Sequence, residues 1–595
     1  MKQFFKMFFA SLLAMVVMSI IVFGVFIGAI AMAISGAVKS DKEVSVGKNS
    51  VLVIETDNTV HEQTEKNSIA FFADGDGFQP GVYEAIKAMK HAEDDDDIKG
   101  VLIKASGNGS GWATSQQLRQ AIIDFKKSGK FVYAYSEGMT QGGYYMATAA
   151  DSIYLNPAGD MELKGFATTL AFFKGTLDKL EVEPEIFYAG KFKSATEPFR
   201  TDKMSDANKI QVTEFQKDFW TEFTGAVAQF TKTTPDAVNQ LAQSGVIEEP
   251  KDALSNKLVS GLLYWDQVED RIKAKTGDKE KDKVNYVSLG EYAESVKGSD
   301  GKSSDAKVAV LFAEGNIIDG TSEDDYQIAS HDMIAEIKKL RDNDKVKAVV
   351  LRVNSPGGSA RASEVILREL QLLKAKKPLV VSMGDLAASG GYYISCQADS
   401  IFAMPNTITG SIGVFGMMFN TGKLMQNKLG VTFDGVKNAP YADFPSGIRA
   451  LTPDEGAKMQ RSVDNIYTVF KSRVAAGRKM DVGLVDSFAQ GRVWTGTDAL
   501  QIHLVDALGG LDRAIASAAA LAKLKDYKVS TYPASIDKFE TMMKKFGGKN
   551  ASTEVVKAAM QNEMSEEYGW LKQLKELRSM NGQALMLLPF QMVTK

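Results

Sequence analysis

Continuous apolar runs of strand length alternate with amphipathic helical patterns along most of the chain. In its second half, residues 308–312, 348–353 and 379–383 are uninterrupted apolar runs rich in β-branched residues, which predicts strands. Between the last two runs, residues 363–374 carry apolar side chains at helical spacing. Strand, helix and strand in that order indicate βαβ units, and apolar residues on both strand faces indicate a parallel sheet covered on both sides. We therefore predict α/β domains.

One apolar segment is much longer than any strand. Residues 8–34 are mostly Phe, Leu, Ile, Val, Met and Ala, and no charged residue lies between Lys6 and Lys39. A helix of this length measures about 40 Å, more than the roughly 30 Å of a bilayer core. We predict a retained transmembrane anchor. The alternative is a signal peptide cleaved near residues 31–33 (Ala-Met-Ala), whose apolar stretch would be shorter. Lysines flank both ends, so charge alone leaves the orientation open.

Two stretches of the chain repeat one pattern. Residues 99–165 match residues 347–413 without a gap at an offset of 248, and both copies contain Gly-Gly-Tyr-Tyr, at 142–145 and at 390–393. Between the copies, residues 298–305 are rich in Gly, Ser and charge, which is typical of a linker. An internal duplication predicts two domains of the same fold.

Length, charge and cysteine content narrow the class of protein. A chain of 595 residues needs at least two domains. The net charge of -4 and the pI near 5.9 argue against a nucleic-acid partner. The single cysteine, Cys396, excludes an internal disulfide, and none of the four histidines is spaced as a ligand pair. We therefore expect neither a metal nor another cofactor.

Two segments of the second copy combine glycine and serine directly after a predicted strand. Residues 354–359 (NSPGGS) let backbone N–H groups approach a substrate without hindrance from Cβ atoms. Residues 383–393 (MGDLAASGGYY) place Ser389 among small residues at a predicted helix start, where free N–H groups favour developing negative charge. The alternatives are a tight turn and an N-cap. The first copy carries Gln141 at the position of Ser389, which favours an activity kept by one copy.

A serine nucleophile needs a base, and neither segment contains histidine. Lysine is the other known partner for serine. At its ordinary pKa of about 10.4 a lysine is almost fully protonated at pH 7, so a catalytic lysine must be buried without a carboxylate partner. The chain contains 70 lysines and arginines, and spacing alone does not select one of them.

Four motifs in order resemble the signal peptide peptidase A (protease IV) family in its long, duplicated bacterial form. They are GKFKSATEPF at 190–199, NSPGGS at 354–359, GDLAASGGYYIS at 384–395 and TGSIGV at 409–414. The resemblance implies a membrane-anchored serine protease with a Ser-Lys dyad and a fold related to ClpP and the crotonases. By position it also implies site residues, namely Ser389 as nucleophile, Lys193 as general base, Ser411 as the residue that orients the lysine, and the N–H groups of Gly357 and Gly390 as oxyanion hole.

The two copies differ in a complementary way at these positions. The first copy has Leu163 where the second has Ser411, and the counterpart of Lys193 falls among residues 439–442, none of which is lysine. Each copy therefore keeps what the other lacks, as expected for one composite site.

Two rival lysines and two other functions stay open. Lys191 would point to the same side as Lys193 if the stretch is extended, and Lys437 is the second rival. A crotonase-like acyl-CoA hydratase or thioesterase is one alternative function, because fold does not determine reaction. An inactive membrane scaffold is the other. Neither would need Ser389 and Lys193 together.

The resulting prediction is a membrane-anchored serine endopeptidase that hydrolyses apolar peptides such as cleaved signal peptides. The resemblance implies a single-pass protein of the bacterial inner membrane, with its body on the periplasmic side, and we expect a homo-oligomer. We predict two tandem ClpP/crotonase-like α/β domains after one transmembrane helix. The predicted segments are a tail at 1–7, the anchor at 8–34, the first repeat at 50–295, a linker at 296–306, the second repeat at 307–535 and a C-terminal helical extension at 536–595.

Overall fold

The computed structural model covers the two predicted repeats almost completely. It describes residues 46–66, 77–279, 281–298, 304–322, 326–537 and 583–587, together with Met15 and Met18. From Lys48 onward the chain forms one compact unit. The predicted anchor at 8–34 lies outside the described residues, apart from the helical Met15 and Met18. No helix within the described residues is long and apolar enough to cross a membrane.

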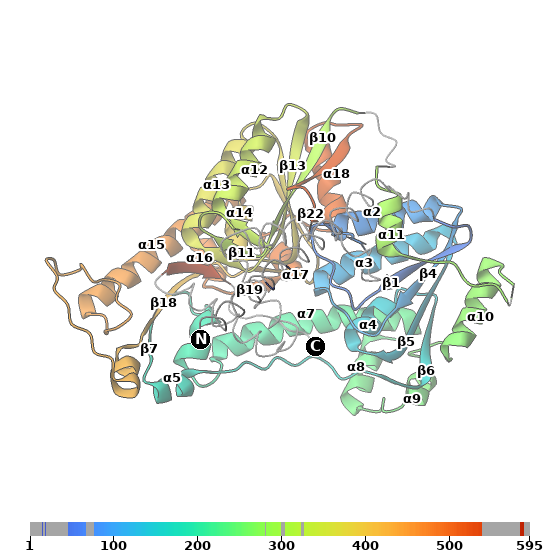
Figure 1. Cartoon of the computed structure of the whole chain (residues 1–595), viewed down its shortest axis with the longest axis horizontal. Coiled ribbons are helices and arrows are strands. Elements are labelled where there is room, and N and C mark those ends of the chain that lie inside the picture. Colours follow the sequence, from blue (N-terminus) through green and yellow to red (C-terminus); the bar gives the residue numbers. More distant parts are fainter. Residues whose placement is uncertain are drawn as a thin grey trace, which may run out of the picture. The chain divides into compact units, whose positions relative to one another are not determined.

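A parallel sheet is built from the first sequence copy (Figure 1). Its described strands follow the order β8-β6-β5-β4-β1-β9, and every neighbouring pair is parallel. The strands are β1 (Ser50–Glu55), β4 (Ile98–Lys104), β5 (Phe131–Met139), β6 (Ser152–Met161), β8 (Gly261–Leu262) and β9 (Tyr286–Ser288).

A second sheet repeats this order with the second copy. Its main path is β20-β16-β15-β13-β10-β21, again parallel, and β17 and β19 continue from the end of β15. The three predicted apolar runs lie in β10, β13 and β15, which confirms them as parallel strands. The strands are β10 (Lys307–Glu314), β13 (Val346–Ser355), β15 (Leu379–Ala388), β16 (Ser400–Ala403), β17 (Ile408–Gly410), β19 (Val493–Thr495), β20 (Ala507–Leu508) and β21 (Lys528–Tyr532).

The helices also recur in pairs, which supports the duplication. Both long helices begin at a capped residue, because the Ser205 hydroxyl accepts from Asn208 N and the Thr452 hydroxyl accepts from Glu455 N. The pairs are α2 (Val82–Asp94) with α12 (Ser330–Asp342), α3 (Trp112–Phe125) with α13 (Ala360–Lys374), α4 (Gln141–Ala147) with α14 (Gly390–Ser395), α7 (Asp206–Thr231) with α15 (Pro453–Arg478), α8 (Pro235–Ser244) with α16 (Val482–Phe488), α9 (Pro250–Ser255) with α17 (Gly496–Gln501), and α10 (Trp265–Thr276) with α18 (Leu511–Leu521).

Several short helices have no such pairing. They are α5 (Lys174–Leu180), α6 (Glu197–Arg200), α11 (Leu289–Ser295), the 3₁₀ turns η2 (Lys126–Ser128) and η3 (Ser194–Thr196), and the π-turn η4 (Leu424–Lys428).

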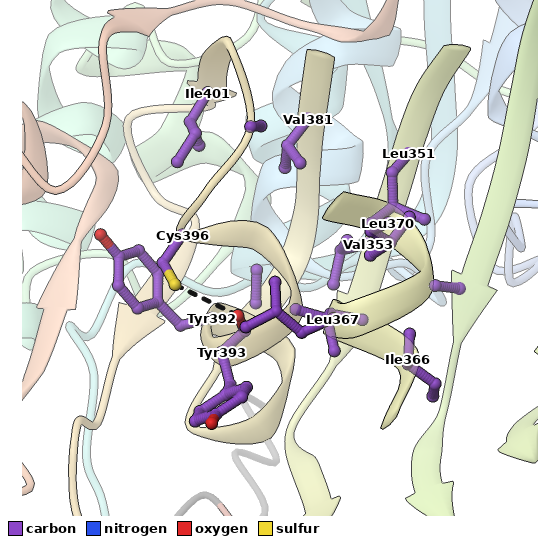
Figure 2. Packing of buried hydrophobic residues seen from close by; sticks show 14 of the residues in the cluster. Leu351, Val353, Ile366, Leu367, Leu370, Val381, Tyr392, Tyr393, Cys396 and Ile401 are labelled. Carbon is purple, nitrogen blue, oxygen red and sulfur yellow. Dashed lines mark hydrogen bonds between the residues drawn. The ribbon is translucent and has the colours of Figure 1, made fainter. Parts of the chain in front are cut away.

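The second sheet is buried on both faces, as the continuous apolar runs predict. Along β10, Val308 and Val310 join a core cluster with α18, whereas Ala309 and Leu311 join the opposite cluster. Figure 2 shows that second cluster, in which side chains of α13 and α14 pack against β13 and β15. Its members include Cys396, whose Sγ donates to the carbonyl of Tyr393 at 3.2 Å. Burial raises the pKa of this thiol to about 12, which keeps it protonated and unreactive.

A third sheet joins the two copies. Strand β7 of the first copy pairs with β18 of the second over seven residues in antiparallel register, and the two lie side by side in Figure 1. The described order is β12-β11-β14-β23-β18-β7. The strands are β7 (Glu183–Ala189), β11 (Asn316–Ile318), β12 (Gln327–Ala329), β14 (Gly357–Ser359), β18 (Val414–Asn420) and β23 (Gln583–Leu587).

A small fourth sheet and a buried ion pair tie the copies together elsewhere. The sheet consists of β22 (Ile536–Asp537), β2 (Glu65–Lys66) and β3 (Phe78–Gln79). Arg352 of β13 donates from Nε to Glu62 at 2.7 Å, and both side chains are fully buried. The predicted helical extension at 536–595 falls mostly outside the described residues. Its described pieces, in β22 and β23, are strands.

Candidate active site

Ser389 lies at a strained turn between β15 and α14. Its backbone has φ 56° and ψ -113°, a conformation that is unfavourable for any residue with a Cβ atom. The turn is held because Ser389 N donates to the carbonyl of Gly410 at 2.8 Å and Tyr393 N donates to the carbonyl of Ser389. Ser389 occupies the N-cap position of α14, yet its side chain makes no capping bond. The hydroxyl is therefore available for another partner.

That partner is Lys193. Its Nζ lies 2.9 Å from Ser389 Oγ, although the two residues belong to different copies. Lys193 follows β7, and the pairing of β7 with β18 carries it across to the second copy. The lysine is 1% exposed, and burial holds its pKa well below the ordinary value. Among the described residues, no carboxylate opposes that shift.

Ser411 completes the contacts of the lysine amine. Lys193 Nζ donates to Ser411 Oγ at 3.0 Å and to the Ser411 carbonyl at 3.3 Å. A neutral amine has two N–H groups and one lone pair. If both N–H groups bond to Ser411, the lone pair is left to accept the proton of Ser389 Oγ. The structure thus brings three predicted site residues together in an arrangement suited to a neutral amine.

The backbone of residues 490–492 is hydrogen-bonded both to the loop that carries Lys193 and to Ser411. The sequence analysis did not identify this segment as part of the site. Phe192 N donates to the Gln490 carbonyl at 2.8 Å, and Ser411 N donates to the Arg492 carbonyl at 2.7 Å. Gly491 has φ 75°, and a Cβ atom there would lie 2.7 Å from Lys193 Cβ. Glycine is therefore required both by the backbone conformation and by the close approach of the lysine.

Helix α7 supports the same loop from the other side. Gln211 donates from Nε2 to the Phe192 carbonyl at 3.2 Å and to Ser194 Oγ at 2.9 Å. Its Oε1 accepts from Val493 N at 3.3 Å, so one amide links the first copy to β19 of the second. Buried Glu197 accepts from Asn208 Nδ2 at 2.9 Å. The motif around Lys193 is therefore anchored on both copies.

The two predicted oxyanion glycines lie next to each other. A Cβ atom built on Gly390 would lie 3.2 Å from the Cα of Gly357, so glycine permits the contact. Gly390 is the first residue of α14, where an N–H group has no partner within the helix. The N–H of Gly357 donates to Ser355 Oγ at 3.1 Å, so this N–H already has a partner in the structure.

The rival lysines are not part of this cluster. Lys191 is exposed, lies over the ring of Phe192 at 5.1 Å, and lines a surface cavity of about 430 Å³. The extended stretch that would put Lys191 on the same side as Lys193 does not form, because residues 191–192 form a turn. Lys437 is exposed and pairs with Asp443 at 3.0 Å.

A repeated parallel α/β fold, with a buried serine hydroxyl at a strained strand-to-helix turn, has the architecture of a serine hydrolase. Comparison with family models narrows this class. The model described as peptidase family S49 matches residues 124–279 and 371–525, and that described as Clp protease matches residues 299–409.

Curated relatives agree over most of the chain. The chain is 38% identical over 493 residues to Protease 4 of Salmonella typhi, covering 81% of this chain and 79% of that protein. It is 37% identical over 450 residues to Protease 4 of Haemophilus influenzae, covering 74% and 72%. It is 32% identical over 437 residues to the chloroplastic serine protease SPPA of Arabidopsis thaliana, covering 72% and 64%.

The chain belongs to peptidase family S49. It is a serine protease with duplicated S49 regions and a ClpP-like α/β fold, and neither the acyl-CoA enzyme nor the inactive scaffold is supported.

Proposed function

We propose that this protein is a membrane-anchored endopeptidase that hydrolyses apolar peptides, such as released signal peptides, through a dyad of Ser389 and Lys193. The observation that carries the proposal is the 2.9 Å contact between Lys193 Nζ and Ser389 Oγ. Because burial holds the pKa of Lys193 well below its ordinary value, more of the amine is neutral at a given pH than in an exposed lysine, as a general base requires.

Acylation begins when Ser389 Oγ attacks the carbonyl carbon of the scissile peptide bond. The Oγ proton passes to the lone pair of Lys193 Nζ, and the carbonyl oxygen becomes an oxyanion. Gly390 N–H, at the start of α14, is placed to donate to this oxyanion. For Gly357 to donate as well, its N–H must leave Ser355 Oγ. The N–H of the adjacent Gly358 is the alternative donor.

Collapse of the tetrahedral intermediate breaks the C–N bond and leaves an acyl ester on Ser389. The Lys193 ammonium protonates the departing amine and becomes neutral again. Water then attacks the ester while Lys193 accepts its proton, and the proton returns to Ser389 Oγ as the acid product leaves. Ser411 keeps the amine oriented throughout, through its Oγ and its carbonyl. No metal or cofactor enters this sequence.

The anchor and the substrate class belong to the same proposal. Residues 8–34 form the apolar segment that would hold the enzyme at the bacterial inner membrane, with the body on the periplasmic side. An enzyme held at a bilayer meets apolar peptides there at high local concentration. Phe415 and Met417 of β18 place apolar side chains beside the lysine loop, which suits such peptides. We also propose that the protein works as a homo-oligomer.

The test is hydrolysis of an apolar fluorogenic peptide by the full-length protein in detergent. We expect Ser389→Ala and Lys193→Met each to lower kcat/KM by about 10³-fold or more. Lys191→Met is the matched control, because this lysine is two residues away but exposed, and it should leave kcat/KM within about two-fold. Circular dichroism confirms that each variant is folded. Full activity in either of the first two variants would refute the dyad.

A further inference from the structure

The surface cavity beside the lysine loop comes within one residue of the buried base. Lys191 and Phe192 line it from the loop, and residues 486–490 and Arg492 line it from the second copy. Phe192 is 7% exposed, and Lys193, the next residue, is 1% exposed and does not line the cavity. Along the chain, only Phe192 therefore lies between a residue at the cavity and the lysine that contacts Ser389.

Arg492 contacts Phe192 with the face of its guanidinium. Its Cζ lies 5.1 Å from the centroid of the Phe192 ring and 4.1 Å from that of Trp494, both within the range of cation–π contacts. Its Nη2 donates to Glu214 of α7. Its Nε is buried and has no hydrogen-bond partner among the described residues, so the ring contacts hold that side of the group. The guanidinium thus joins the lysine loop to β19 and α7.

The backbone of Arg492 contacts the site as well. Its carbonyl accepts from Ser411 N at 2.7 Å, so one residue contacts both the loop of the lysine and the serine that binds the lysine amine. The alignment that pairs Gly245 with Gly491 puts Val246 of the first copy at the position of Arg492. Val246 is 44% exposed. An arginine therefore occurs in the copy that receives the lysine loop.

Charged side chains of both signs surround Arg492 and the cavity. They are Lys191, Lys471, Glu214, Asp486 and Asp498. Asp486 pairs with Lys471 at 2.7 Å. The pKa of Lys193 is lowered by burial, so exclusion of water is what favours its neutral form.

We propose that Arg492 is a positioning residue that holds the Phe192 ring as a wall between the surface cavity and the Lys193 amine. If the wall loosens, water from the cavity reaches the amine. The pKa of Lys193 then rises, because burial is what lowers it. Less of the amine is neutral at a given pH, and base catalysis weakens. This inference rests on the proposed function, because it takes Lys193 as the general base.

The first test is peptide hydrolysis by full-length Arg492→Met. We expect kcat at pH 7 to fall by about ten-fold, with KM within about two-fold of the wild type. The pH midpoint of kcat/KM should move up, so that the loss shrinks at higher pH. Phe192→Ala removes the wall but no charge, and it should move the midpoint in the same direction. A midpoint that stays or moves down in Arg492→Met would overturn the inference.

The matched control is Arg271→Met. The guanidinium of Arg271 lies 5.4 Å from the ring centroid of Tyr154, so the same kind of contact is removed from the first copy. This variant should leave kcat and the pH midpoint unchanged. An equal upward shift in Arg271→Met and Arg492→Met would contradict a local role for Arg492.

Arg492→Lys separates stacking from charge. Lysine keeps the positive charge but has no planar group to lie flat against the two rings. We expect kcat to fall by about three-fold, and the midpoint to move up less than in Arg492→Met. A wild-type midpoint in Arg492→Lys would show that charge alone matters, and the wall would be refuted.

Hydrogen exchange tests the wall without catalysis. In the wild type, Phe192 N donates to the Gln490 carbonyl at 2.8 Å and Lys193 N donates to the Gly190 carbonyl at 3.1 Å. In Arg492→Met, these two amides should exchange about ten-fold faster or more, because the loop opens more often. Arg271→Met should keep the wild-type rates there. Should Arg492→Met fail to fold, Arg492→Lys supplies the same comparison.

Failure of this inference can be told apart from failure of the proposed function. Wild-type exchange of the loop amides in a folded Arg492 variant contradicts the wall, whether or not Lys193 is the base. Hydrolysis that survives Lys193→Met instead contradicts the dyad and leaves the exchange result intact.

Discussion

The two copies use the same turn for different purposes. In the second copy, Ser389 directs a free hydroxyl at Lys193. At the aligned position in the first copy, Gln141 is buried, and its Oε1 accepts from Lys164 N and Gly165 N, both at 2.8 Å. The amide thereby ties helix α4 to the loop that corresponds to the Ser411 loop. The same turn thus holds a structural contact in the first copy and the contact between Ser389 and Lys193 in the second.

The converse holds for the lysine. The first copy extends β7 towards the second and ends it at the loop that carries Lys193. In the second copy, the corresponding residues 439–442 lie in an exposed stretch without a strand. A duplicated domain can therefore divide one site between its copies, provided that a sheet bridges them. The predictions below challenge this division, from the largest expected effect to the smallest.

Lys193→Arg should lower kcat/KM by about 10³-fold or more, because a guanidinium stays charged and offers no lone pair. In the wild type, kcat/KM should rise with pH and level off above the pKa of Lys193, which burial holds well below its ordinary value. The measurement is a pH profile of peptide hydrolysis for both proteins.

The first copy provides a control for this prediction. Gln141→Ser, added to Ser389→Ala, should restore no activity, because the lysine contacts position 389. Substantial hydrolysis by that double variant, or by Lys193→Arg, would show that the division between copies is wrong.

Arg352→Ala should lower the free energy of unfolding by about 3–5 kcal/mol, because it leaves the fully buried Glu62 without its partner. The aligned residue of the first copy, Lys104, pairs with Glu55 at 2.8 Å, but both side chains are 49% exposed. Lys104→Ala should therefore cost less than about 1 kcal/mol. Urea unfolding measures the free energy of unfolding of the two variants. Equal losses in Arg352→Ala and Lys104→Ala would contradict the role given to burial.

Gly491→Ala should lower kcat by about 10–100-fold with little change in KM, because its Cβ would push against Lys193 and displace the amine. Gly245 is the aligned glycine of the first copy, also with positive φ, and nothing lies within 4 Å of its Cβ position. Gly245→Ala should destabilise the fold slightly through backbone strain and leave kcat unchanged. Steady-state kinetics of the two variants tests this, and the prediction fails if they behave alike.

Ser411→Ala should lower kcat/KM by about ten-fold, because the amine loses one of its orienting acceptors. A hydrogen bond to Ser411 Oγ favours the charged amine over the neutral one, so its loss should lower the pKa of Lys193 further. The pH midpoint should accordingly move down. Thr409→Val, which removes a nearby buried hydroxyl bonded to the Ala387 carbonyl, is the control. A midpoint that moves up would contradict the assigned contact.

Local sequence pattern predicted most of the scaffold. The runs at 308–312, 348–353 and 379–383 lie in β10, β13 and β15, and the helical pattern at 363–374 lies in α13. These predictions succeeded because burial on both faces leaves a continuous apolar signal within each strand. The matching strand orders followed from the repeat, since similar sequences at a constant offset fold alike.

The remaining features depend on contacts between distant segments. Nothing periodic in residues 183–189 shows that β7 pairs with β18, and nothing in residues 583–587 shows that β23 enters the same sheet. Gly491 carries a weak signal, a glycine after a helix, but its approach to Lys193 exists only in the folded chain. The choice between Lys191 and Lys193 also depended on the folded chain, because the rival would share the side of Lys193 only in an extended stretch, and residues 191–192 form a turn.

On the proposed mechanism, the sequence separation of 196 between Lys193 and Ser389 also determines when the enzyme becomes active during synthesis. At a ribosome speed of about 5–20 residues per second, Ser389 is made roughly 10–40 s after Lys193. Throughout that interval, the nascent chain contains Lys193 but lacks Ser389 and Ser411, and β7 has no β18 to pair with. On the proposed mechanism, a growing or prematurely terminated chain is unable to cut its neighbours. Proteolysis begins only when translation has delivered the second copy and the two halves have joined.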